Sequence, residues 1–384
     1  MKVLIRKLTR RICLAATLLV AISFLLSCLV EFVSPASWWI VSFFGLAVPY
    51  LVAILLLLVL FWLIAKPAFA LIPVAALAIG YRQINAFFAF NISSQPVAQK
   101  SAEKIRILSW NVRNFVAITD NKERIKHNKQ EIVASILSTN ADVLCLQEFN
   151  HSSTKGAQDD NISLFTAKYP HYHFSRDLVK KNGFYEYGSI IFSRYPIVNR
   201  GRIRYRGRTA ESLVFIDIAK GKDTIRIHTT HLQSFRFNEA DYQDIEKIQQ
   251  QDDETLRASL NIFQKMKRAF VQRGNQAATV RKQLDKSPYP SIITGDFNDV
   301  PNSFTWFHIK GNYSDAFLKK GFGVGRTYIS LAPTLRIDYI LSSPRWEVDH
   351  FDMIDEALSD HLMLVADLKL LPQRPEDVPL MFTF

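Results

Sequence analysis

A long apolar stretch near the N-terminus limits what this chain can fold into. Over Ile12–Ala65 the only charged side chain is Glu31. A helix needs about 20 consecutive apolar residues to cross the hydrocarbon core of a bilayer, so the stretch is long enough for two spans. A weaker third segment follows, interrupted by Arg82 and Gln83. The sequence predicts transmembrane helices near residues 12–31, 40–65 and 68–88, within a membrane anchor of residues 1–90.

The distribution of charge along the chain accounts for its basic net charge of +12. Residues 1–100 contain eight basic and one acidic residue, a net charge of +7, and the rest of the chain contains 39 basic and 34 acidic residues, a net charge of +5. Five of the cationic residues precede Ile12, which places the N-terminus in the cytoplasm by the positive-inside rule. Three spans then put the residues after about 90 outside the cytoplasm, whereas two spans would leave them inside. We expect an integral protein of the cell (inner) membrane.

A cleaved signal peptide is the alternative interpretation of the first apolar segment. Lys2–Arg11 would be its basic region, and Leu25–Cys28 resembles a lipoprotein cleavage site. The strongly apolar sequence beyond Cys28 would still require a membrane. Anchoring is therefore expected in either case.

The sequence changes character after a polar segment, residues 91–104, that is typical of a linker. Short β-type runs then alternate with turns and a few helical stretches, before a tail of residues 372–384. Predicted strands cover 105–110, 143–147, 189–193, 203–205, 213–218, 224–231, 291–294, 337–341 and 362–368. Predicted helices cover 122–138, 241–285 and 303–309. Many strands with few long helices favour an α+β sandwich over residues 105–371 rather than a repeat of parallel β-α-β units.

Polar side chains stand where two of these strands end. Asn111 finishes the strand that begins at Ile105, and Glu148 follows the strand that begins at Val143. A single Asn or Glu after a strand is most often a turn former. Two of them at the mouths of neighbouring strands are hard oxygen ligands of the kind that Mg²⁺ prefers.

Further strand ends carry side chains suited to acid–base chemistry. His231 ends an apolar strand, and Asp296 and Asn298 follow another strand through a tight glycine turn. Their spacing of two places both side chains on the same side of an extended segment. The set of candidates is completed by Asp338, near the start of the predicted strand 337–341, and by the adjacent pair Asp360 and His361, directly before the predicted strand 362–368.

Six short motifs, in one order, resemble the endonuclease/exonuclease/phosphatase superfamily. They are SWN, LQE, the His-Leu of THLQ, GDFND, RIDYIL and SDH, between Ser109 and His361. The superfamily includes pancreatic deoxyribonuclease, apurinic/apyrimidinic endonucleases, bacterial sphingomyelinases and inositol polyphosphate 5-phosphatases. The resemblance implies a four-layered α/β/β/α sandwich with two mainly antiparallel sheets. It also implies metal-dependent hydrolysis of phosphate esters, with Mg²⁺ as the cofactor or Mn²⁺ in its place.

The resemblance also implies a role for each candidate residue. Asn111 and Glu148 match the primary metal site, with Asp360 near the same ion. Asp296 matches the residue that orients or deprotonates the attacking water, and Asn298 the one that holds a phosphate oxygen. The remaining matches are an Asp-His pair and a histidine placed to protonate a leaving oxygen, namely Asp338 with His361, and His231.

The sequence leaves the substrate open between nucleic acid and phospholipid. A net charge of +5 on the soluble part is small for a nuclease, because affinity for nucleic acid depends on many contacts between cations and phosphates. A phospholipid diesterase, like a sphingomyelinase, fits a catalytic domain that is tethered beside a bilayer, on its extracytoplasmic side. Arg336-Ile-Asp338-Tyr stands where 5-phosphatases carry Trp-Cys-Asp-Arg, which argues against inositol phosphates. A membrane-anchored binding module without turnover is the third alternative, and no protein partner is inferred.

The stretch between His231 and Gly295 is rich in helix formers and contains Arg273 and Gln276 in an Arg-x-x-Gln pattern. Superfamily members often have such a helix here. We expect an outer helix that covers one sheet, with Arg273 in a structural role rather than on the substrate.

Overall fold

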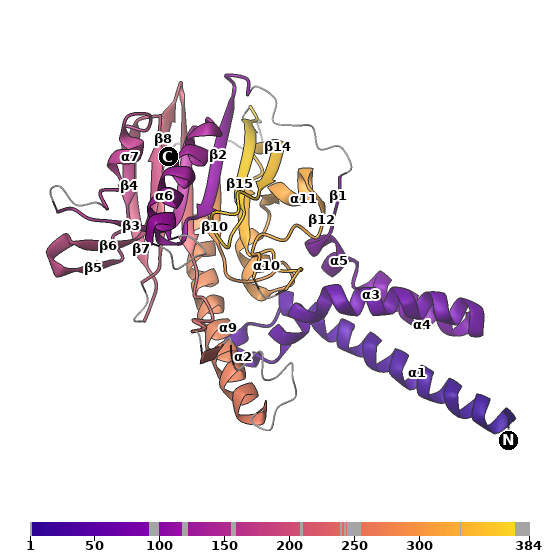
Figure 1. Cartoon of the computed structure of the whole chain (residues 1–384). Helices are drawn as coiled ribbons and strands as arrows, with labels where there is room; N and C mark the ends of the chain where they lie inside the picture. The colour runs from indigo at the N-terminus through magenta and orange to yellow at the C-terminus, as the bar shows by residue number, and fades with distance from the viewer. Residues whose placement is uncertain are drawn as a thin grey trace, which may run out of the picture. The chain divides into compact units, whose positions relative to one another are not determined.

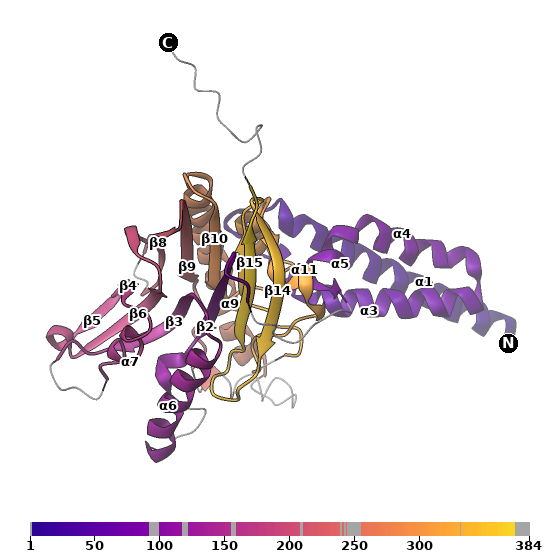
Figure 2. The same cartoon turned by 90° about the horizontal axis from the view of Figure 1, so that it is seen from above.

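The computed structural model describes residues 2–91, 100–116, 122–154, 159–207, 210–238, 240–241, 243, 255–330 and 332–372 (Figures 1 and 2). Most of the predicted linker, the start of the predicted helix 241–285 and nearly all of the predicted tail lie outside these residues. The chain divides into two compact units. One contains residues 1–89, 233–278 and 298–309, and the other contains residues 90–232, 279–297 and 310–384.

The first unit is helical in the part of it that the structure describes. Its N-terminal helices are α1 (Lys2–Ser27), η1 (Cys28–Glu31), α2 (Pro35–Trp38), α3 (Val41–Ala65), η2 (Pro67–Ala70), α4 (Leu71–Ile79) and α5 (Tyr81–Phe87). Two helices among the described residues, Arg6–Glu31 and Val41–Ala65, are long and apolar enough to cross a membrane. The helix pair Pro67–Ile79 and Tyr81–Phe87, bent by 61°, has the length and composition of either a broken third span or a re-entrant loop. Residues 233–278 and 298–309, which the sequence assigns to the sandwich, belong to this unit.

In its described residues the second unit contains two large β-sheets, besides the pairing of the short strands β1 (Ala89–Phe90) and β12 (Phe322–Gly323). The first sheet has the order β11 (Ser314–Asp315), β13 (Asp338–Ser342), β10 (Ser291–Asp296), β9 (Asp223–His231), β8 (Ser212–Lys220) and β7 (Ile197–Arg204). The second has the order β14 (Trp346–Ile354), β15 (Met363–Leu370), β2 (Lys104–Asn111), β3 (Val143–His151), β6 (Tyr185–Ser193) and β4 (His171–Phe174), with β5 (Leu178–Lys180) beside β6. Neighbouring strands are antiparallel except for two parallel pairs, β2 with β3 and β9 with β10.

The two sheets pack face to face through their central strands. β3 of one sheet contacts β9 and β10 of the other, and a buried hydrogen bond from Gln147 Nε2 to Thr229 Oγ1, 2.8 Å long, joins them. Helix α6 (Lys122–Ser138) covers the outer face of the second sheet and contributes Ile132 and Ile136 to its core (Figure 2). The fold is the four-layered α/β/β/α sandwich that the sequence predicts.

The outer face of the first sheet is covered by the last turns of helix α9 (Thr255–Asp285), where Val280 and Leu284 are buried. Arg281 of these turns lies close to His228 of β9. Burial and then the cations Arg226 and Arg281 lower the pKa of His228 to about 3, so this histidine is neutral and structural.

Several short elements complete the fold. They are β1 (Ala89–Phe90), η3 (Arg113–Phe115), α7 (Ser163–Thr166), η4 (Lys181–Gly183), α10 (Phe304–Lys310), α11 (Ala316–Lys320) and β12 (Phe322–Gly323). The nine predicted strands are all present, but β7 begins six residues before the predicted start at 203. Strands β5 and β14 have no counterpart in the prediction, nor do the two-residue strands β1, β11 and β12. β14 lies at a sheet edge and carries charged residues, so it lacks a continuous apolar run.

Candidate active site

The two parallel pairs of strands bring the predicted residues to one edge of the sandwich. In β2 and β3 the register pairs Asn111 with Gln147, so Glu148 follows one residue beyond Asn111. The register of β3 against β6 shifts between Leu146 and Phe149, and Glu148 has a left-handed backbone, with φ of 50°. An irregularity of this kind re-aims a side chain at the end of a strand.

The Asn111 amide joins two carboxylates. Its Nδ2 atom donates to Glu148 Oε1 and to Asp296 Oδ2, at 3.2 Å each, while its Oδ1 atom accepts from the Arg113 backbone N–H at 3.1 Å. Asn111 and Asp296 are at most 1% exposed, whereas the Glu148 side chain is 26% exposed. Side chains from two different sheets therefore meet here.

Strands β9 and β10 place His231 beside Asp296, because the parallel register pairs the two residues directly. His231 Nε2 lies 3.6 Å from Asp296 Oδ2 and 3.8 Å from Glu148 Oε1. This close approach requires the glycine before Asp296. Gly295 has a φ of 134°, and a Cβ atom there would lie 1.9 Å from the carbonyl oxygen of Thr230.

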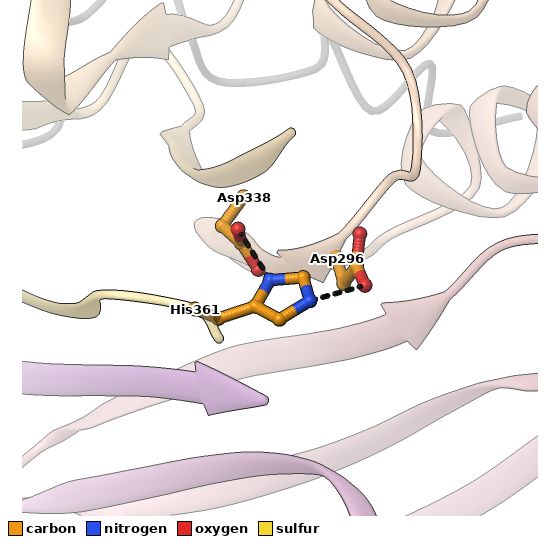
Figure 3. Close-up of side chains that lie close together, drawn as sticks. All are labelled: Asp296, Asp338 and His361. Carbon is orange, nitrogen blue, oxygen red and sulfur yellow. Dashed lines mark hydrogen bonds and ion pairs between the residues drawn. The ribbon is translucent and has the colours of Figure 1, made fainter. Parts of the chain in front are cut away.

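Asp338 and His361, which the family resemblance pairs, lie in contact (Figure 3). His361 Nδ1 lies 2.9 Å from Asp338 Oδ2, and its Nε2 faces Asp296 Oδ2 at 3.8 Å. Burial lowers the pKa of His361, but the neighbouring carboxylates, above all Asp338 and Asp296, outweigh it and raise the pKa to about 10. The imidazole is therefore protonated at neutral pH, with one N–H held by Asp338 and the other directed at Asp296.

Two sets of oxygen and nitrogen ligands are available to a metal ion. The predicted set is Asn111, Glu148 and Asp360. Asp360 is joined to this edge through Ser359, whose Oγ donates to Asn111 O at 2.8 Å and lies 3.4 Å from Asp360 Oδ1. The second set, Asp296, Asp338 and His361, has ligand atoms within 4.8 Å of one another, but His361 would have to lose a proton before it could coordinate an ion.

The position of Asn298, another predicted site residue, is known from its place in the loop after β10. It stands two residues after Asp296, beyond the end of β10, and its backbone is left-handed with φ of 53°. It belongs to the compact unit that contains the N-terminal helices, as do Arg273 and Asp299. Its role on a phosphate oxygen remains a prediction.

Aromatic residues that the sequence motifs do not mark as functional lie around the Asp-His pair. Trp110 Nε1 donates to the backbone carbonyl of His361 at 2.8 Å, and the Tyr328 ring lies 4.9 Å from the imidazole. Burial raises the pKa of the Tyr187 phenol, and neighbouring groups, first of all the carboxylates of Glu148 and Glu211, raise it further. Trp110 belongs to the SWN motif, but nothing in the sequence marks Tyr187 or Tyr328.

Arg273 has the surroundings of a structural residue. It is fully buried, and it donates from Nε to Asp299 Oδ2 at 3.1 Å and from Nη1 to Gln233 O at 2.9 Å. Its guanidinium also lies over the rings of Phe235 and Phe270. These contacts agree with the expectation that Arg273 supports the fold.

Solved structures of related fold are similar to this chain at low sequence identity. An endonuclease/exonuclease/phosphatase from Beutenbergia cavernae is 21% identical, with a TM-score of 0.47 over 70% of this chain and 72% of that one. A humanized D. rerio TDP2 with 14 mutations is 17% identical, with a TM-score of 0.49 over 70% and 99%. The human nocturnin catalytic domain with a bound sulfate is 19% identical, with a TM-score of 0.48 over 71% and 96%.

Two family models match the sequence. One is described as a domain of unknown function (DUF8431) and matches residues 10–87. No curated protein matches the chain. The other model, the endonuclease/exonuclease/phosphatase family, matches residues 108–361. Since that match spans more than half of the sequence, the chain belongs to the endonuclease/exonuclease/phosphatase family.

Proposed function

We propose that this chain is a membrane-anchored phosphodiesterase that hydrolyses its substrate by in-line attack of water on phosphorus, with Mg²⁺ as cofactor or Mn²⁺ in its place. Its family generally hydrolyses phosphoester bonds with divalent metals. The observation that carries the proposal is the convergence of Asn111, Glu148, His231, Asp296, Asp338 and His361, which are linked by contacts of 2.9 to 3.8 Å.

The predicted metal ligands fit a hard divalent cation. Asn111, Glu148 and Asp360 offer amide and carboxylate oxygens, the donors that Mg²⁺ prefers. The Glu148 and Asp360 side chains are 26% and 21% exposed, which leaves room for the waters that Mg²⁺ retains. A divalent ion bound there would neutralise negative charge on the phosphoryl oxygens and on the departing oxygen.

The protein side chains supply the proton transfers. Asp296 is placed to orient the attacking water and to accept its proton, and His231 to protonate the leaving oxygen. Asp338 holds Nδ1 of the protonated His361. The Nε2–H of the imidazole then points toward Asp296, where it donates to a phosphoryl oxygen of the substrate. Asn298 holds a further phosphate oxygen.

An assay of the full-length protein in detergent tests this function. We expect hydrolysis of bis-p-nitrophenyl phosphate with Mg²⁺ or Mn²⁺, a loss of at least about 100-fold with a chelator, and recovery when metal is restored. The Asp296→Asn variant is the control for contaminating enzymes. Turnover that survives the chelator, or that survives in the Asp296→Asn protein, would contradict the proposal.

The same assay separates the substrate classes. DNA and RNA represent the nuclease alternative, and sphingomyelin and phosphatidylinositol phosphates represent the phospholipid alternative. A membrane anchor is compatible with a lipid substrate, but tethering alone does not choose between the two classes. No turnover on any of these substrates would favour a binding module without catalysis.

The contacts within the helical unit support three membrane spans. Arg82 of α5 forms an ion pair with Glu31, at the end of the first apolar helix. Asn302 Nδ2 donates to Gln83 O and Oε1 at 2.8 and 3.0 Å, and a Cβ on Gly45 would lie 2.0 Å from Asn302 O. The end of α5 therefore lies at the same end of the helix bundle as the beginning of α3.

This arrangement requires α4 and α5 together to run back along the whole of α3. In a membrane, they would cross it a third time. With the basic N-terminus in the cytoplasm, the chain after Phe87 then begins outside it. We therefore place the catalytic residues on the extracytoplasmic side.

A reporter fusion tests this topology. Alkaline phosphatase fused after Phe384 is expected to be active, because that enzyme matures only outside the cytoplasm, whereas a fluorescent protein that folds only in the cytoplasm is expected to stay dark there. The same reporters fused after Lys66, which lies between the second and third spans, should give the opposite result. A C-terminal reporter that is active only in the cytoplasm would overturn the three-span topology.

A further inference from the structure

Helix α9 has a strongly basic composition that a sheet-covering helix does not need. It contains seven basic residues and one acidic residue, Asp285. The basic residues are Arg257, Lys265, Lys267, Arg268, Arg273, Arg281 and Lys282. Its last turns cover a sheet, and Arg273 is buried, but neither fact explains why the middle of the helix is basic. There, between Ser259 and Gln272, the sequence has three cations and no acidic residue.

This middle segment packs against the start of the second apolar helix (Figure 1). The Phe263 ring stacks on Phe43 of α3 with a centroid distance of 4.9 Å, and it meets Trp39 edge-on at 4.9 Å. About three turns further along α9, a Cβ on Gly274 would lie 3.1 Å from Pro35 Cδ. α9 therefore lies along the segment that connects the first two spans, where Trp39 has the position of an interfacial aromatic residue.

The outward side of the segment combines apolar and cationic side chains. Leu260 is 54% exposed and Phe263 is 40% exposed. Lys267 and Arg268 are exposed on the following turns, and Lys267 Nζ lies 4.9 Å over the Trp39 ring. Lys265, in contrast, is engaged with Asp241 at 2.5 Å. A helix with apolar and cationic residues on one exposed side is typical of segments that lie in a membrane interface.

We propose that the exposed face formed by Leu260, Phe263, Lys267 and Arg268 binds the bilayer surface and recognises anionic phospholipid headgroups. The inference rests on the proposed membrane anchoring. Two observations select a lipid surface as the occupant. The face is continuous with Trp39 and Phe43 at the end of a membrane span, and its charge is complementary to anionic lipids.

Fluorescence of the full-length protein in lipid nanodiscs tests this contact. Leu260→Cys carries an environment-sensitive label, in a background with Cys13→Ala and Cys28→Ala. Cys145 needs no replacement, because it is fully buried and burial raises the pKa of its thiol to about 12. We expect nitroxide-labelled lipids to quench the label, at least about twofold more in discs with phosphatidylglycerol than in discs of phosphatidylcholine alone.

Two further variants control the experiment. A label at Ser138→Cys, at the exposed end of α6 in the sandwich unit, should show no dependence on phosphatidylglycerol. Adding Lys267→Glu and Arg268→Glu to the labelled Leu260→Cys protein should abolish the preference for phosphatidylglycerol, since each cation near an anionic surface changes affinity by about fivefold.

The outcomes separate this inference from the proposed function. The inference is overturned if the protein co-elutes with the discs but the label at position 260 stays in water in both kinds of disc. In that case the face would bind a protein partner instead. Quenching without hydrolysis of bis-p-nitrophenyl phosphate would support the inference and contradict the enzyme. Protein that does not enter discs at all would overturn both the anchor and the surface.

Discussion

Replacing His361 with asparagine is expected to lower metal-dependent phosphoester hydrolysis by about 10²- to 10⁴-fold, the range that a positioned acid–base group contributes. The protonated imidazole is 7% exposed, is held by Asp338 and directs its second N–H at Asp296. Asparagine keeps a polar side chain but cannot carry that proton. Turnover of bis-p-nitrophenyl phosphate by purified full-length variants measures the effect.

The Asp338→Asn variant tests whether Asp338 acts by holding His361. If Asp338 acts by holding the imidazole, the double variant with His361→Asn should lose no more activity than His361→Asn alone, because residues that act as a unit are not additive. His350→Asn, in edge strand β14, is the matched control and should keep wild-type turnover. Near wild-type activity of folded His361→Asn protein would refute the assignment.

The largest expected effect on stability comes from a buried ion pair behind the site. Arg336 Nη1 contacts Asp315 Oδ2 at 2.7 Å, and each side chain is 1% exposed. Asp315 Oδ1 also accepts the backbone N–H groups of Phe317 and Leu318 at the start of α11. The Arg336 guanidinium stacks over an aromatic ring on either side, 4.7 Å from Phe317 and 5.0 Å from Tyr339.

Asp315→Ala is therefore expected to lower the free energy of unfolding by about 3–5 kcal/mol, because it leaves a buried cation without its partner. Denaturant unfolding of the full-length protein in detergent, followed by tryptophan fluorescence, measures the change. The control is Asp159→Ala, which breaks the pair of Asp159 with Lys129, 2.8 Å apart, at a site where Asp159 is 55% exposed. That variant should lose less than about 1 kcal/mol. Equal losses in the two variants would contradict the structural role of Arg336.

This result would also show that two residues of the RIDYIL motif have different roles, Arg336 in stability and Asp338 in holding His361. The sequence shows Arg336 and Asp338 as neighbours in one motif. The structure turns them to different surroundings, Arg336 to a buried carboxylate on β11 and Asp338 to His361. Alternation along an extended chain predicts that two residues at i and i+2 share a face. Arg336 lies before β13, which begins at Asp338, so the alternation of the strand does not set the direction of its side chain.

The polar interruption of the third apolar segment has a similar explanation. Arg82 and Gln83 weaken the prediction of a span, because polar groups are costly in lipid. In the structure Arg82 pairs with Glu31, and Gln83 is 2% exposed and accepts from Asn302. Since Asn302 lies more than 200 residues away in the chain, no local pattern could reveal this partner.

The sequence by itself determined the elements whose signals are local. Apolar length predicted the helices α1 and α3, strand patterns predicted the central strands, and motif order predicted the family and most of the residues that meet at the site. Only the tertiary structure decided how they meet. The backbone irregularity that re-aims Glu148, the parallel register that sets Asp296 beside His231, and the packing of α9 on Trp39 and Phe43 all depend on contacts between distant segments. Such contacts arise from packing of the whole chain and leave no periodic trace in the sequence.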